Sequence, residues 1–136
     1  MAGPRVFTLE EAEQMLPDVE AAFVELDELR ETLRQAKLKL SAIEMIWGPA
    51  IQKPDCPDHK EGLALFKQLS ETQEEVAGIV QRLGSMGVVV KDVATGLVDL
   101  YHVRDGRLVY LCWKRGEEGF SAWHHVDEGF ASRQPL

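Results

Sequence analysis

The hydrophobic pattern of the sequence changes period once, at Gly87, and this change constrains the fold more than any other feature. Before Gly87, apolar residues recur at intervals of three, four and seven positions, which places them on one stripe of an α-helix. After it, four short segments alternate apolar and polar residues, as β-strands do. The sequence therefore predicts an α+β protein in which helices precede a small antiparallel sheet.

The first helix is predicted to begin at Thr8, because Thr8 and Glu11 have the spacing of a capping box. Its apolar stripe continues to Ile46, so the helix would be roughly 58 Å long at about 1.5 Å per residue. Pro17 lies inside the pattern and has no backbone N–H, so we expect a kink or a division into two collinear segments there.

A second, shorter helix is predicted after a connection rich in proline and glycine near 47–58. Two long helices with a short connection most simply form an antiparallel, coiled-coil-like hairpin, here over residues 8–86. The shorter second helix would leave part of the first apolar stripe uncovered, around Ile43, Ile46 and Trp47. We expect a second copy of the chain to cover it, giving a homodimer.

Residues 87–136 are predicted to form an antiparallel meander of three or four strands and a C-terminal tail. Asp105-Gly106 is a strong signal for a two-residue hairpin turn, because both residues tolerate positive φ. One face of this hairpin should pack against the helices. The turn predicts these cross-strand pairs: Arg104 with Arg107, His102 with Val109, Leu100 with Leu111 and Val98 with Trp113 on that face, and Tyr101 with Tyr110 and Asp99 with Cys112 on the other.

The end of the chain, SAWHHVDEGFASRQPL, holds the candidate functional residues. His124, Asp127 and Asp99 could converge beside Cys112 and bind a divalent metal such as zinc, if the last strand turns His124 toward the Cys112 face. The preceding loop, RGEEG, leaves this parity open, since a shift of one residue reverses every side chain. In the alternative, which we prefer, His124 and His125 only cap a strand end.

Two other candidate sites have weaker patterns. Cys56 and His59 form half of a zinc motif, but the second helix would hold them roughly 40 Å from the sheet. Cys112 is a poor nucleophile, because Asp99 beside it would raise the pKa of the thiol. The sequence contains no nucleophile elbow, phosphate-binding glycine loop or H-E-x-x-H motif, which favours a protein that is not an enzyme.

Arg133 could fasten the C-terminal tail to the sheet. Its guanidinium can bind a carboxylate through two hydrogen bonds, and the tail would gain apolar anchors from Phe130 and Leu136. The candidate acidic partners are Asp92, Asp99, Asp127 and Glu128.

The composition limits the class of partner. The chain has 136 residues, 45% of them hydrophobic, which suits one domain with its own core. A formal net charge of -8 disfavours nucleic acid and anionic membrane surfaces. No apolar run reaches the roughly 20 residues that span a bilayer, and the N-terminus lacks a secretory signal pattern. With two cysteines far apart, we expect a cytoplasmic protein with reduced thiols.

Three motifs, FTLEEAEQMLP, VKDVATGLVDL followed by VYLCWKRGE, and WHHVDEGFASRQPL, make the whole chain resemble the bacterial family named domain of unknown function 2203. The resemblance implies a small cytosolic protein with a helical hairpin and a short sheet, and it implies no activity. His125 stands where the family usually has a carboxylate. The resemblance implies a shared polar set of Asp92, Asp99, Trp113, His124, Asp127 and Arg133.

Two hypotheses about function follow. In the first, the protein is a non-enzymatic interaction module that binds itself or another protein through the hairpin, without a cofactor. In the second, His124, Asp127 and Asp99 bind a divalent metal, which activates water for hydrolysis.

Overall fold

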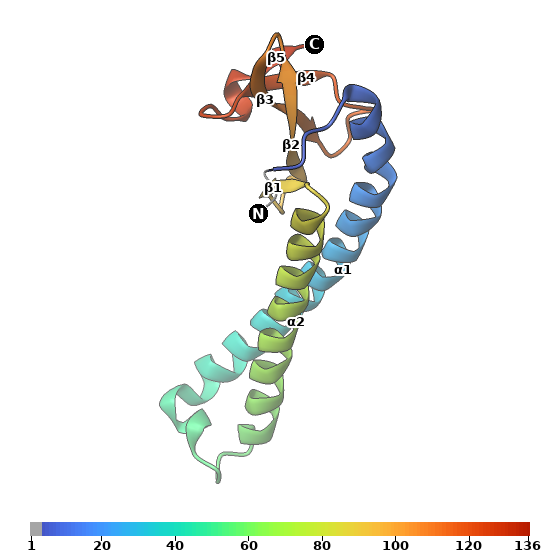
Figure 1. The fold of residues 1–136 in the computed structure, drawn as a ribbon. Helices are drawn as coiled ribbons and strands as arrows, with labels where there is room; N and C mark the ends of the chain where they lie inside the picture. The colour runs from blue at the N-terminus through green and yellow to red at the C-terminus, as the bar shows by residue number, and fades with distance from the viewer. Residues whose placement is uncertain (1–3) are drawn as a thin grey trace. The chain divides into compact units, whose positions relative to one another are not determined.

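The computed structural model describes residues 4–136, and its elements follow the predicted order (Figure 1). The α+β class is confirmed, and the sheet has five strands where three or four were predicted, because the tail adds β5. The elements are α1 (Leu9–Trp47), the 3₁₀ helix η1 (Gly48–Gln52), α2 (His59–Ser85), β1 (Val89–Asp92), β2 (Leu97–Arg104), β3 (Arg107–Lys114), β4 (Ala122–His125), the 3₁₀ helix η2 (Phe130–Ser132) and β5 (Gln134–Pro135).

The chain is organised as two compact units. The sheet unit comprises the described residues up to Val24 together with Val80–Leu136. It therefore holds the start of α1, the end of α2 and all the strands. The hairpin unit comprises Glu25–Ile79, which are the remaining turns of both helices and the segment that joins them. That residues 1–136 form a single domain stays a prediction.

The start of α1 is the predicted capping box. The Thr8 amide donates to Glu11 Oε1 at 2.9 Å, and the Glu11 amide donates to Thr8 Oγ1 at 3.1 Å. Of the two outcomes expected at Pro17, a division of the helix is wrong, because Pro17 lies inside one helix of 39 residues, and a kink stays a prediction. Leu16 and Val19 beside it are buried, and their packing offsets the backbone hydrogen bond that proline cannot donate.

The hairpin unit has a small apolar core. Ala36 and Ile43 of α1 pack with Leu65 of α2, and four half-buried side chains surround them: Leu40, Trp47, Ile51 and Leu69. Trp47 Nε1 donates a hydrogen bond of 2.7 Å to Asp58, which fastens the connection to α1. The expectation that Ile43 and Trp47 would be uncovered was therefore wrong, whereas Ile46 is exposed.

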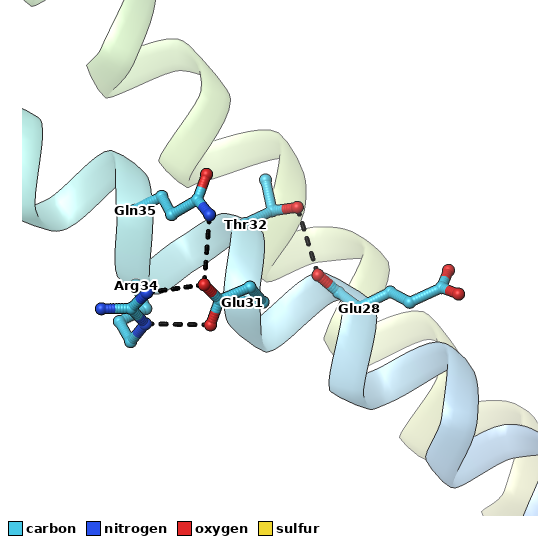
Figure 2. A network of polar contacts seen from close by, with 5 residues as sticks. All are labelled: Glu28, Glu31, Thr32, Arg34 and Gln35. Carbon is cyan, nitrogen blue, oxygen red and sulfur yellow. Dashed lines mark hydrogen bonds and ion pairs between the residues drawn. The ribbon is translucent and has the colours of Figure 1, made fainter.

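A network of exposed polar and charged side chains lies on α1 (Figure 2). Arg34 forms a two-point ion pair with Glu31, at 2.6 and 2.9 Å, and Gln35 donates to the same carboxylate. The hydrogen bonds from Arg34 lower the pKa of Glu31 to about 2. Both partners of the ion pair are at least half exposed, so the pair contributes little to stability.

The sheet is an antiparallel meander in which the strands lie in sequence order, β1-β2-β3-β4-β5. The β2–β3 register is the predicted one in every pair, including Asp99 with Cys112. Asp105 and Gly106 have φ values of 51° and 74°, the positive values that a type I′ turn requires.

The main core lies on one face of this hairpin, against α1. Val98, Leu100, Leu111 and Trp113 are at most 1% exposed. The Trp113 ring lies 6.4 Å from the ring of Phe23 in α1, centroid to centroid. This confirms which face of the β2–β3 hairpin packs against the helices.

Candidate functional site

The opposite face of the sheet holds a buried polar cluster of Asp99, Cys112 and His124. These residues lie on the three neighbouring strands β2, β3 and β4. β4 pairs with β3 so that His124 stands opposite Tyr110, which turns the imidazole to the Cys112 face and settles the strand parity left open by the sequence. One ligand atom from each residue lies within 4.8 Å of the other two, and each residue is at most 2% exposed.

The hydrogen bonds of His124 determine which of its ring nitrogens must carry hydrogen. Nδ1 lies 2.8 Å from the carbonyl oxygen of His125, which can only accept, so Nδ1 must carry hydrogen. Nε2 lies 3.1 Å from both carboxylate oxygens of Asp99. A hydrogen bond between these groups needs one further proton, on either His124 or Asp99. In both forms the pair has no net charge.

Burial controls the acidity of the other two members of the cluster. It raises the pKa of Asp99, while the charge and hydrogen bond of His124 and the charge of Lys91 oppose that increase. Burial, together with the Asp99 charge and hydrogen bond, raises the pKa of Cys112 to about 12, although Arg133 acts in the opposite direction. At neutral pH Cys112 is therefore a thiol, which is the unreactive state for a nucleophile.

Aromatic side chains and a lysine adjoin the cluster on the same face. The Tyr110 hydroxyl donates to that of Tyr101 at 3.0 Å, and the Tyr110 ring lies 5.4 Å from the imidazole of His124. The Lys91 ammonium lies 4.9 Å from the centre of the Tyr110 ring. Lys91 sits where the β1–β2 register shifts, and the sequence pattern gave no signal that would place it here.

Three residues that the sequence had grouped with His124 lie elsewhere. Asp127 is exposed in the turn after β4 and is not a member of the converging group. Asp92 accepts a hydrogen bond of 3.0 Å from the amide of Ala94, in the turn between β1 and β2. The ring of His125 makes an edge contact with Trp123, at 5.1 Å between centroids. The ligand set that converges is therefore Asp99, Cys112 and His124.

Arg133 does fasten the tail, but to a carboxylate that was not expected. It binds Glu117 through both terminal nitrogens, at 3.0 and 2.9 Å. Glu117 also anchors Trp113, whose Nε1 donates to its carbonyl oxygen. The predicted partners of Arg133 were wrong because β5 pairs with β4, which brings Arg133 to the loop between β3 and β4. The Arg133 guanidinium also lies 4.2 Å from the ring centre of Phe130.

The half zinc motif stays in the helical connection. His59 Nδ1 donates to the carbonyl of Ile51 at 2.8 Å, and Cys56 is a half-buried free thiol. Within residues 4–136, neither belongs to a group of three converging ligand side chains.

Comparison with protein families places the whole of this architecture in one family. Residues 5–136 match the family described as Uncharacterized conserved protein (DUF2203). The chain belongs to the DUF2203 family. The match includes every strand that contributes to the cluster and both helices of the hairpin. Searches of the curated proteins and of the solved structures found no match. In residues 4–136, no helix of this DUF2203 member has the length and apolar character to cross a bilayer.

Proposed function

We propose that this protein is a non-enzymatic interaction module that forms a homodimer through its helical hairpin, at the end where the connection joins α1 to α2. The observation that carries the proposal is a set of large apolar side chains exposed there on both helices. Met45 and Ile46 of α1 are 87% and 69% exposed, and Leu63 and Phe66 of α2 are 59% and 66% exposed.

A groove adjoins two of these side chains. It has a volume of about 280 Å³ and is bordered by Leu63 and Phe66 of α2 and by Leu40 and Glu44 of α1. The η1 residue Ile51 lies at one side. Burying one exposed Leu or Phe side chain contributes roughly 1.5–3 kcal/mol, so a partner that covers this groove gains stability from it.

The apolar side chains that the hairpin unit leaves exposed support a second copy as that partner. One cluster of its core is formed by Ala36, Ile43 and Leu65, while Met45, Ile46, Leu63 and Phe66 of the same unit stay exposed. In a two-fold dimer, the same surface on each copy supplies both halves of the interface. In such a dimer, the exposed apolar side chains of each hairpin are buried against those of the other copy.

The buried cluster of the sheet supports a role without hydrolysis. A hydrolytic centre needs access for water and substrate, and Asp99, Cys112 and His124 are at most 2% exposed. The raised pKa of the Cys112 thiol also disfavours covalent catalysis.

Sedimentation equilibrium of the full chain tests the proposal. We expect a concentration-dependent dimer, and we expect Phe66→Asp to weaken it by about 30-fold or more, because the change places a charge in an apolar contact. Val24→Asp is the matched control, since Val24 is also a half-exposed apolar residue in a helix but lies in the sheet unit. A wild-type monomer at all concentrations, or equal weakening by both substitutions, would refute the proposal.

A further inference from the structure

We propose that Asp99, Cys112 and His124 form a binding site for a single zinc-like divalent cation, held by one carboxylate, one thiolate and one imidazole. The inference is independent of the proposed self-association, because the cluster belongs to the sheet unit. In this site Cys112 is a ligand in place of Asp127, which the sequence had suggested.

The geometry of the three donors matches the needs of such an ion. Zinc binds at about 2.0–2.3 Å from nitrogen, oxygen and sulfur ligands, so tetrahedral ligands lie about 3.3–3.8 Å apart. The three donor atoms here lie within 4.8 Å of one another, so small side-chain movements bring them to these separations. The Asp99 oxygens are both 3.1 Å from His124 Nε2, so either of them can serve as the carboxylate ligand.

The imidazole is already oriented as a ligand. Metal-binding histidines commonly donate the hydrogen of their second ring nitrogen to a carbonyl or carboxylate, which fixes the tautomer. His124 Nδ1 donates to the carbonyl oxygen of His125 at 2.8 Å, so Nε2 is the nitrogen that can offer a lone pair toward Asp99 and Cys112.

Binding requires an exchange of protons for the ion. The proton shared by Asp99 and His124 must leave, and so must the thiol proton of Cys112, because the ligands are a carboxylate, a neutral imidazole and a thiolate. The balanced step is release of about two protons for each divalent ion bound. No oxidant or reductant takes part.

Two cationic side chains next to the cluster, Arg133 and Lys91, each affect the metal affinity in two opposing ways. Arg133 lowers the pKa of Cys112, and the charge of Lys91 lowers that of Asp99. Both favour the deprotonated ligands, which helps metal compete with protons, and both repel the bound ion. We therefore expect weaker binding than in a structural zinc site with four protein ligands.

Titration of the reduced full chain with cobalt(II) tests the site, because a cobalt–thiolate bond gives a charge-transfer absorption band in the near ultraviolet. We expect the band to saturate at about one ion per chain, to be displaced by zinc, and to grow with release of about two protons. Cys112→Ser should abolish the band, since serine keeps the size and hydrogen bond of the side chain but not the thiolate.

The two control variants change Cys56 and Asp127, which the sequence suggested as metal ligands and which lie outside the proposed site. Cys56→Ser removes the other thiol and Asp127→Asn removes the exposed carboxylate, and we expect both to bind cobalt as the wild type does. Lack of a band in the wild type, or its persistence in Cys112→Ser, would overturn the proposal. Loss of the band in Cys56→Ser would also overturn it. If Cys112→Ser does not fold, Cys56→Ser decides: Cys112 is then the remaining thiol of the chain, so a saturable band in this variant supports the ligand set and its loss contradicts it.

Discussion

The proton held between Asp99 and His124 makes the buried cluster a stabilising element of the sheet in the metal-free protein. Replacing His124 by Ala leaves the Asp99 carboxyl in a buried site without its main partner. We expect His124→Ala to lower the free energy of unfolding by about 2–4 kcal/mol, measured by urea denaturation. His125→Ala removes the neighbouring, partly exposed imidazole and should cost less than about 1 kcal/mol. Equal losses in the two variants would contradict the assigned role of His124.

The two thiols should differ in reactivity. Cys56 is half-buried in the connection, whereas Cys112 is 0% exposed and its pKa is raised to about 12 by burial and Asp99. We expect a thiol-specific disulfide reagent at neutral pH to label Cys56 rapidly in the native protein and Cys112 only after unfolding in urea. Comparable labelling rates for both thiols in the native state would show that the cluster is open to solvent.

The ion pair of Glu117 and Arg133 should make stability depend on acidic pH. Burial raises the pKa of Glu117, but the hydrogen bonds from Arg133 and from the Lys114 amide lower it more, so its folded value lies below the unfolded one. Such a carboxylate stabilises the fold at pH values above its ordinary pKa and ceases to do so as pH falls through the folded value.

We therefore expect the difference in unfolding free energy between wild type and Glu117→Gln to be largest near neutral pH and to shrink below about pH 4. Urea denaturation at a series of pH values measures it, and added salt should reduce it, because the pair is partly exposed. A difference that stays constant with pH would contradict the assignment.

At the scale of elements, the turn between β2 and β3 is set by its glycine. Gly106 has a φ of 74°, and no atom lies within 4 Å of where a Cβ would be, so Gly106→Ala adds only backbone strain. We expect a loss of about 1 kcal/mol. Gly78→Ala is the matched control within α2, where the space is also open, and alanine should stabilise the helix by about 0.5–1 kcal/mol. The same sign for both changes in thermal unfolding would contradict this account.

The sequence predicted those elements whose determinants are local. The capping box fixed the start of α1, and the Asp105-Gly106 turn fixed the pairing of Asp99 with Cys112, because a two-residue turn leaves one register. The pairing places Asp99 beside Cys112, so the sequence alone predicted that these two members of the cluster are neighbours.

The remaining features depend on contacts between distant segments. The loop from β3 to β4 does not fix the parity of β4, so the position of His124 is decided by packing of the whole sheet. The choice of Glu117 by Arg133 follows from the pairing of β5 with β4, which no local pattern specifies. Likewise, Pro17 remains inside α1 because tertiary packing outweighs its local preference.

At the scale of the whole molecule, the two units have cores of different kinds. The sheet unit buries large side chains such as Trp113, Phe23 and Leu100. The hairpin unit packs around Ala36, Ile43 and Leu65 and exposes Phe66 and other large apolar side chains. We interpret this difference as a division of roles, in which the sheet unit is stable within one chain and the hairpin unit depends on association.

Hydrogen exchange of the wild-type protein at several protein concentrations tests this central claim most directly, because it locates association in the chain. We predict that protection of backbone amides in the part of α2 within the hairpin unit rises with protein concentration, while protection of β2 and β3 does not change. Protection that is independent of concentration throughout α2 would contradict self-association through the hairpin.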